Sequence, residues 1–180
     1  MSASIPDAPK YNVNDYAQWQ GDWELWDGIA IAMSPSPFGE HQFVQAGLIR
    51  ELGNGLRASA CQAVVVGELD WIICDDTVVR PDVMVICGGI PERHLQRAPG
   101  LVAEVLSPST RNNDLGFKRR LYASQGVSTY LIVEPDAKSI ELLVLQADGQ
   151  YESMNSRDAI ELRPCEDCWI QIKPSDVFAV

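Results

Sequence analysis

The spacing of apolar residues changes along the chain, and each change predicts a new type of element. Between residues 39 and 59, Val44, Leu48, Leu52 and Leu56 recur every four residues, which predicts a helix with one apolar stripe. The short runs CQAVVV, ELDWII and VVRPDVMVI follow. Because these runs are rich in β-branched residues, they predict strands.

The second half of the chain continues this alternation. GLVAEVL predicts a strand and SPSTRNN a loop, after which Asn113 or Asp114 can cap a helix that runs to Gln125. Gly126 is a natural stop for that helix. STYLIVE predicts a further strand, and KSIELLVLQ with QYESM predicts a hairpin. Short strands and turns are expected in the remainder.

The N-terminal region predicts smaller elements. Residues 1–10 are expected to form a loose arm, and residues 12–20 a short helix capped by Asn12 or Asn14. In WELWDGIAIAM, the Asp-Gly pair between apolar flanks predicts a hairpin, and the Ser-Pro repeats of residues 34–37 end the pattern.

The order of these elements indicates the fold class. A helix, three strands, a helix and a strand form the centre, and extra β-hairpins lie at both ends. This order is typical of a mixed α/β (α+β) layer fold. A length of 180 residues favours one domain over two, so residues 1–180 are expected to fold together.

Composition adds few constraints. Hydrophobic residues make up 46% of the chain and charged residues 22%, as in ordinary globular proteins, so the core is expected to need no disulfide or metal. No stretch approaches the ~18 apolar residues that span a bilayer, and residues 1–12 lack the apolar run of a signal peptide. These features favour a cytoplasmic location.

The five cysteines predict little chemistry of their own. Cys61, Cys74 and Cys87 lie in or beside apolar runs and are expected to be small core residues. Cys165 and Cys168 form a CxxC pair, which supplies only two of the four ligands of a structural zinc site. A structural turn is favoured there over redox or metal chemistry.

Charge is distributed unevenly along the chain. The net charge of −11 argues against a broad, sequence-independent grip on nucleic acid, which depends on lysine and arginine contacts to phosphate. Residues 80–120 nevertheless hold seven of the fourteen basic residues and four acids, so this segment has a net charge of +3. It is either a phosphate-facing surface or a solvated face without a partner.

Two acidic residues lie inside apolar strands. Asp82 belongs to RPDVMVI and Glu104 to LVAEVL, on consecutive core strands. A carboxylate in such a run costs free energy unless it is paired or binds a cation. If both side chains lie on the same face of the sheet, they can share one hard divalent ion such as Mg²⁺.

Lys118 lies fourteen residues after Glu104, on the next predicted helix. Helical spacing places it with Leu115, Leu121 and Tyr122, which are expected to pack on the sheet. The ammonium can reach the strand ends, or it can extend into solvent over Tyr122. On a partly exposed helix face, loss of this side chain is expected to cost no more than ~1 kcal/mol.

The chain resembles a known protein family in these segments. RPDVMVICGG, LVAEVLSPSTRNNDLGFKRRLYASQGVSTYLIVEP, and the upstream WELWDG and MSPSP-x-x-x-H are similar to the Uma-two family of restriction-endonuclease-like proteins, a branch of the PD-(D/E)XK nucleases. The resemblance covers roughly residues 12–150. It implies a restriction-endonuclease-like core of helix, three strands, helix and strand.

The resemblance also implies roles for individual residues. Asp82, after Pro81, is the motif aspartate and Glu104 the motif glutamate. The usual lysine lies two residues later, where this chain has Leu106, and Lys118 is expected to replace it. The family's opening segment often has an acid at the position of Ile29, which leaves Glu24 as the acid of that segment.

The expected activity is metal-dependent hydrolysis of phosphodiester bonds in DNA. Asp82, Glu104 and the carbonyl of Val105 are expected to hold Mg²⁺ or Mn²⁺, while Lys118 orients the attacking water. His41, which matches a family position, is a secondary candidate, and the arginines expected to contact phosphate are Arg111, Arg119 and Arg120. Ser107, Ser109 and Thr110 are further candidates for phosphate contact.

Two alternatives stay open. The first is a catalytically inactive nuclease fold that acts in binding or assembly, which the net charge and Leu106 favour. The second is a metal-dependent enzyme acting on a smaller substrate such as a nucleotide. A homodimer is expected, partly from the resemblance and partly from the apolar terminal hairpins with Trp23, Trp26 and Trp169.

Overall fold

A six-stranded sheet forms the centre of the protein. The computed structural model describes residues 9–33, 39–154 and 158–179. The strand order is β10-β9-β8-β7-β6-β3, and only β7 and β8 are parallel neighbours. The strands are β3 (Ala63–Gly67), β6 (Val83–Cys87), β7 (Leu101–Val105), β8 (Thr129–Glu134), β9 (Ser139–Leu145) and β10 (Tyr151–Met154).

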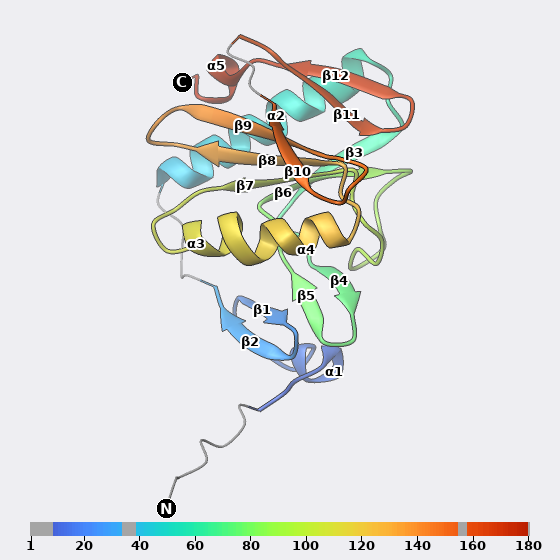
Figure 1. Ribbon diagram of the computed structural model, residues 1–180, viewed down its shortest axis with the longest axis vertical. Helices are drawn as coiled ribbons and strands as arrows, with labels where there is room; N and C mark the ends of the chain where they lie inside the picture. The colour runs from blue at the N-terminus through green and yellow to red at the C-terminus, as the bar shows by residue number, and fades with distance from the viewer. Residues whose placement is uncertain (1–8, 34–38, 155–157, 180) are drawn as a thin grey trace, which may run out of the picture.

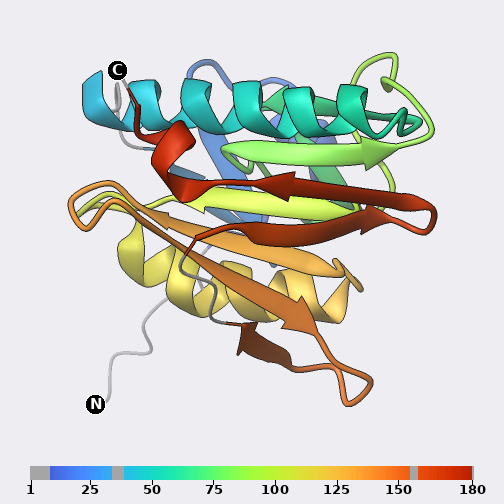
Figure 2. The same cartoon turned by 90° about the horizontal axis from the view of Figure 1, so that it is seen from above.

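Helices cover both faces of this sheet. The long helix α2 (Gly39–Ala58) lies on one face, and the segment formed by α3 (Arg111–Asn113), η1 (Asp114–Lys118) and α4 (Arg119–Ser124) lies on the other (Figures 1 and 2). The apolar stripe of α2 is buried, as its four-residue spacing predicts. Each face therefore has its own hydrophobic cluster, one under α2 and one under α4.

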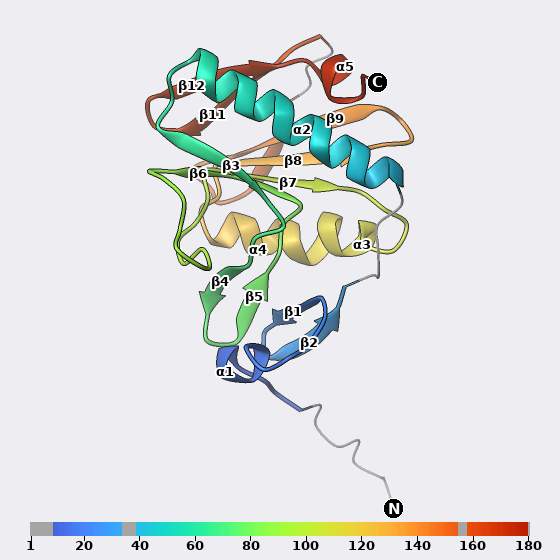
Figure 3. The same ribbon diagram turned by 180° about the vertical axis from the view of Figure 1, so that it is seen from behind.

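A second sheet lies beyond α3 and α4. Its order is β2-β1-β5-β4, formed by β1 (Trp23–Trp26), β2 (Ile29–Ala32), β4 (Trp71–Cys74) and β5 (Thr77–Val79). The helical segment lies between this sheet and the central one (Figures 1 and 3). The run VVRPDVMVI, expected as one strand, is thus divided at residues 80–82 between two sheets. Pro81 lacks the N–H that a ladder needs, which favours this break.

The N-terminal elements match the expected types with different lengths. Helix α1 is limited to Val13–Tyr16 and is capped by Asn12. The β1–β2 turn places Asp27 at φ 49° and Gly28 at φ 81°, the left-handed geometry that a two-residue hairpin requires. The expected arm lies largely, and the Ser-Pro repeats wholly, outside the described residues.

The expected helix of residues 113–125 is not a regular α-helix. A π-helical turn, η1, interrupts it and buries both Asp114 and Lys118. The wider turn changes the direction of the side chains that follow, and Leu115, which was expected to pack on the sheet, is 37% exposed. The prediction for Leu115 is therefore wrong, whereas Tyr122 is fully buried as expected.

The C-terminal segment packs against α2 as a third small sheet. It consists of β11 (Ile160–Cys165), β12 (Cys168–Ile172) and the short helix α5 (Pro174–Val177). Leu162 and Ile170 from the two strands join the cluster under α2. Figure 2 shows this hairpin beside α2 on the same side of the central sheet.

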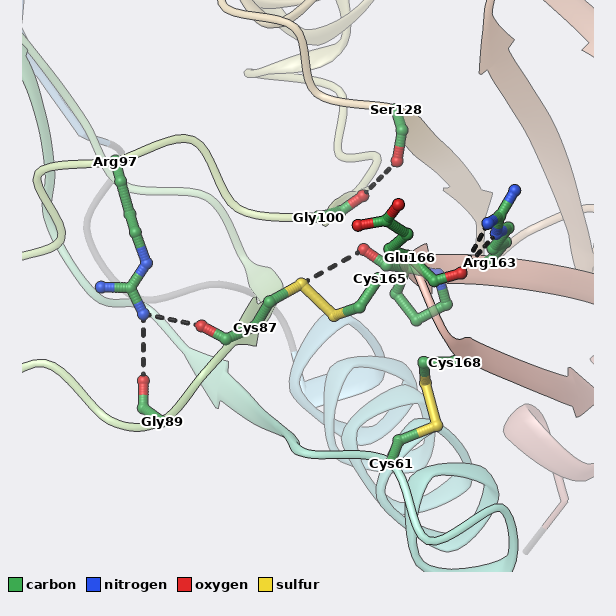
Figure 4. Close-up of a disulfide and its surroundings, with 11 residues drawn as sticks. Cys61, Cys87, Gly89, Arg97, Gly100, Ser128, Arg163, Cys165, Glu166 and Cys168 are labelled. Atoms are coloured by element: carbon green, nitrogen blue, oxygen red, sulfur yellow. Dashed lines mark hydrogen bonds between the residues drawn. A yellow bond between two sulfur atoms is a disulfide. The ribbon is translucent and has the colours of Figure 1, made fainter.

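Two disulfides fasten this hairpin to the core. Cys61 pairs with Cys168, and Cys87 with Cys165 (Figure 4). The residues of the CxxC pair do form a turn, but each also bonds to a distant cysteine. The expectation that Cys61 and Cys87 are simple core residues is therefore wrong, and so is the core position expected for Cys74, which is exposed and unpaired. That the core needs no disulfide for stability stays a prediction.

Candidate active site

A cavity of about 670 Å³ opens where the two sheets, α2 and η1 meet. Its lining combines residues from β1, β2, the start of α2, the segment before β6, and the loop after β7. Within the described residues the charged groups of the lining are Asp22, Glu24, Glu68, Arg80, Asp82, Asp114 and Lys118, together with His41. Five acids against two strong cations make this a negatively charged cavity.

Asp82 and Glu104 lie on the same face of the central sheet. The β6–β7 pairing of Val83 with Ala103 places Asp82 opposite Glu104. Strand alternation groups them with the residues packed under α4 rather than those under α2. The backbone N–H of Asp82 donates to Oε2 of Glu104 at 3.4 Å, which brings the carboxylate of Glu104 to the backbone of Asp82 at this edge.

Asp82 is held by the neighbouring strand and by α2. The backbone N–H of Val105 donates to Oδ2 of Asp82 at 2.7 Å, and Nε2 of His41 lies 3.4 Å from the same oxygen. Gln45, 5% exposed, donates to the backbone carbonyl of Asp82 at 2.9 Å. His41 and Gln45 are one helical turn apart, so α2 presents both to the segment before β6.

Lys118 is buried among three carboxylates. Its ammonium lies 3.0 Å from Glu104, 3.1 Å from Glu24 and 3.7 Å from Asp114, and its exposed fraction is 6%. The π-helical turn directs both Asp114 and Lys118 inward. The sequence left two orientations open for Lys118, toward the strand ends or into solvent over Tyr122. The structure shows the first.

Glu24 and Tyr122 complete the surroundings of Lys118 and Glu104. Glu24 accepts hydrogen bonds from the backbone N–H of Arg80 at 2.7 Å and from the indole of Trp26 at 2.9 Å. The hydroxyl of Tyr122 donates to Oε1 of Glu104 at 2.6 Å. Lys118 and Tyr122 thus share one oxygen of Glu104, while its other oxygen faces Asp82.

The carboxylates outnumber their positive partners. Burial and the charges of Asp114 and Asp82 raise the pKa of Glu104 well above its usual range, although Lys118 opposes this. Burial lowers the pKa of Lys118, but the charges of Glu104, Glu24 and Asp114 outweigh it and the net shift is upward. One ammonium therefore does not neutralise the cluster, and an additional cation would be stabilised there.

The donor set fits a hard divalent cation that keeps part of its water. Carboxylate and carbonyl oxygens suit Mg²⁺ or Mn²⁺, and Mg²⁺ in proteins is often held by only one or two carboxylates. In the described part of the chain, no three His, Cys, Asp or Glu side chains are arranged to bind a metal together. Asp82, Glu104 and the carbonyl of Val105 would therefore share the ion with water.

The arginines expected to contact phosphate lie outside the cavity lining. Arg111 pairs with Glu134, and Arg119 donates to the carbonyl of Tyr151 at 3.4 Å. Arg120 is exposed on α4. Among the other candidates, the hydroxyls of Ser107, Ser109 and Thr110 do line the cavity.

Several residues of the site were missed from the sequence. Arg80 lines the cavity and pairs with Asp22 and Asp70, at 2.7 Å in each case. Asp114, Gln45 and Glu68 were also overlooked, and Tyr122 was assigned to packing alone. The sequence feature that points to Arg80 is its place in the RPD tripeptide directly before β6. No feature of the sequence around Asp114 distinguishes it from other acids that can cap a helix.

Asp114→Asn is expected to stabilise the protein at neutral and alkaline pH. Burial, together with the carboxylates of Asp82 and Glu24, raises the pKa of Asp114 from 3.8 to about 6, although Lys118 and a hydrogen bond from Thr110 oppose this. Ionised Asp114 is thus penalised in the folded state above pH 6, and below pH 3.8 the penalty vanishes. The gain is at most about 3 kcal/mol, since one pKa unit is worth about 1.4 kcal/mol.

Thermal denaturation from pH 4 to pH 8 measures this effect. The melting temperature of Asp114→Asn should exceed that of the unmodified protein at pH 8, and the difference should shrink as the pH falls through 6. Asp136→Asn, at an exposed position, is the matched control. A difference that grows toward acid pH would contradict the assignment.

Comparison with known proteins identifies the family. The Uma2 family, described as "Putative restriction endonuclease", matches residues 13–172. An uncharacterized protein of Synechocystis sp. (strain PCC 6803) is 32% identical, over 91% of both chains. The crystal structure of a "putative nuclease belonging to DUF820" from Anabaena variabilis superimposes with a TM-score of 0.73 at 17% identity, covering 93% of this chain and 97% of that one. The chain therefore has a restriction-endonuclease-like fold and belongs to the Uma2 family.

Proposed function

We propose that the protein is a deoxyribonuclease that hydrolyses phosphodiester bonds with Mg²⁺ or Mn²⁺. The observation that carries the proposal is the pair Asp82 and Glu104, which meet on one face of the sheet with Lys118 buried 3.0 Å from Glu104. Buried carboxylates in excess over their cations favour a divalent ion. Membership of the Uma2 family supports the same chemistry.

Each residue of the site has a defined task in this proposal. Asp82, Glu104 and the carbonyl of Val105 would hold the metal, which would supply a lower pKa for a bound water and neutralise charge on the phosphate. Lys118 and Tyr122 fix one oxygen of Glu104, so that its second oxygen faces Asp82. Lys118 also orients the attacking water and counters negative charge that develops in the transition state.

The negative cavity explains why the reaction would require metal. A phosphodiester that enters beside Asp82, Glu104 and Glu24 is repelled by their charges unless a cation lies between them. The hydroxyls of Ser107, Ser109 and Thr110 can then donate hydrogen bonds to phosphate oxygens without adding charge.

A catalytically inactive binding module is the second candidate. Leu106, 5% exposed, occupies the place where the family pattern has its usual lysine, and the net charge of −11 disfavours tight binding to DNA. Fold alone does not distinguish the two functions. Cleavage of DNA in Mg²⁺ that stops on addition of EDTA would exclude this candidate.

The remaining expectations stay predictions. The homodimer is expected partly from the family and partly from the apolar terminal hairpins. Of their tryptophans, Trp169 is 60% exposed, whereas Trp23 and Trp26 contact other aromatic rings. Phosphate contacts of Arg111 and Arg120 would need DNA to extend beyond the cavity. No helix in the described ranges is long and apolar enough to cross a membrane.

Asp82→Asn is expected to abolish both cleavage and metal binding. Loss of one of two carboxylate ligands should slow cleavage by more than about 100-fold, because even groups that only support metal ligands typically contribute about 10–100-fold. Cleavage of labelled DNA and the rise in melting temperature on adding Mn²⁺ measure the two effects. Asp136→Asn should behave as the unmodified protein. Full cleavage by Asp82→Asn would refute the proposed site.

A further inference from the structure

The active-site cavity has an apolar part as well as an acidic one. Trp26, Ile31, Ala32 and Met33 from the β1–β2 hairpin line it beside the carboxylates. Its volume of about 670 Å³ lies in the range of about 300–1,000 Å³ that small-molecule sites occupy. The cavity thus has space and apolar surface that a phosphate and a metal ion alone would not use.

We propose that this cavity binds one unpaired nucleotide of DNA, with its base against Trp26 and its phosphate beside Asp82 and Glu104. This inference rests on the proposed nuclease function and specifies its substrate class. Single-stranded or frayed DNA is the substrate, and intact duplex is not. Three features of the site support it.

The first feature is the fixed position of the Trp26 ring. Phe117 stacks on it with ring centroids 4.3 Å apart and an interplanar angle of 16°. Its indole N–H donates to Glu24 at 2.9 Å, and Glu24 also contacts Lys118. Phe117 covers one face of the ring, and Trp26 also packs against the cluster under α4, so a base would contact the part of the ring that lines the cavity. Stacking on an aromatic side chain is sequence-tolerant and suits unpaired bases.

The second feature is that the basic residues near the cavity are already paired. Arg80 and Lys118 are the arginine and lysine side chains of the described lining, and both are held by carboxylates. Arg111 pairs with Glu134. A duplex is held largely by many phosphate contacts from basic and polar groups, whereas stacking of one base requires none.

The third feature is the depth of the acidic cluster. Glu24 lines the cavity and is 3% exposed, and Glu104 is 2% exposed and lies 3.0 Å from Lys118 of the lining, so the reacting phosphate must enter the cavity to approach them. In a duplex, bringing one nucleotide inside requires its base to leave the stack, which costs a few kcal/mol. An already unpaired nucleotide avoids that cost, which gives a preference for single strands.

Binding of labelled oligonucleotides tests this inference without relying on cleavage. A short single strand and a blunt duplex of the same sequence are compared by fluorescence anisotropy in Ca²⁺, which also takes carboxylate oxygens. The single strand should bind at least about fivefold more tightly, because one stacked base contributes about 1 kcal/mol at the lower end. Trp26→Ala should remove most of this preference.

Two further variants keep the result interpretable. Trp26→Leu retains an apolar side chain against Phe117 and should also lose the preference, which separates loss of stacking from loss of folding. Trp169→Ala, at an exposed ring on β12, should leave it unchanged. Equal binding of duplex and single strand, or an unchanged preference in both Trp26 variants, would overturn the inference.

Cleavage assays distinguish failure of the inference from failure of the proposed function. Metal-dependent cleavage of duplex as fast as single strand would refute the inference and leave the nuclease function standing. Trp26-dependent binding of single strands without any cleavage in Mg²⁺ or Mn²⁺ would support the nucleotide pocket and refute the nuclease.

Discussion

Lys118→Met is expected to lower the free energy of unfolding by about 3–5 kcal/mol, the usual cost of removing one partner from a buried ion pair. Methionine fits the space but leaves Glu24, Glu104 and Asp114 without the ammonium that now lies 3.0–3.7 Å from them. The premise of a partly exposed helix face is wrong, because the π-helical turn buries this lysine, and a larger loss is now expected than the ~1 kcal/mol that this premise implied.

Urea denaturation at pH 7 measures this loss. Lys173→Met, at an exposed position, is the matched control and should change stability by less than about 0.5 kcal/mol. The variant should also lose cleavage, but the stability measurement does not depend on the proposed function. A Lys118→Met variant as stable as the control would show that the three carboxylates are solvated or protonated without Lys118.

Removal of the Cys61–Cys168 disulfide is expected to have a similarly large effect. The bond spans 107 residues, so it strongly restricts the unfolded chain, and loss of a native disulfide typically costs about 2–5 kcal/mol. Cys168→Ser would also leave a polar hydroxyl at a position only 3% exposed. The β11–β12 hairpin should loosen first, since it packs on α2 and is joined to the core by both disulfides.

Thermal denaturation of Cys168→Ser beside the unmodified protein measures this contribution, and dithiothreitol, which reduces both disulfides, should lower the melting temperature at least as much. Cys74→Ser is the control, because Cys74 is exposed and unpaired, and it should melt at the same temperature as the unmodified protein. Titration of the native protein should detect one thiol of five. A melting temperature unaffected by reduction would contradict this expectation.

The disulfides also bear on the expected compartment. Structural disulfides persist in oxidising surroundings and are rare in the cytosol. The cytoplasmic location was inferred from the absence of apolar segments and stays a prediction. The thiol state of Cys61 and Cys168 in intact cells, trapped by alkylation before lysis, would test it.

Features that depend on local pattern could be predicted from the sequence. The stripe of α2, the Asp-Gly hairpin and the strands around Asp82 and Glu104 follow from short-range spacing, and the structure contains them. The meeting of Asp82 with Glu104 was also predictable, because consecutive antiparallel strands place opposite residues on one face. The residue pattern left two positions open for Lys118, and only the structure shows its ammonium 3.0 Å from Glu104.

Features that depend on distant contacts or irregular backbone could not be predicted. The π-helical turn has no spacing signal, and it exposes Leu115 while burying Asp114. The disulfide partners are 78 and 107 residues apart, so their pairing follows only from the tertiary fold. Arg80 lines the cavity because residues 80–82 connect the two sheets. The run VVRPDVMVI predicts a single strand, so the sequence gives no indication of this connection.

Anomalous diffraction from Mn²⁺-soaked crystals tests the proposed metal site most directly. The proposal predicts one peak within about 2–2.5 Å of oxygens from Asp82, Glu104 and the carbonyl of Val105, the range of hard-cation ligands. The same peak should be missing from Asp82→Asn crystals and present in Asp136→Asn crystals. Strong Mn²⁺ binding elsewhere, with no peak at this cavity while the protein cleaves DNA in solution, would contradict the proposed site.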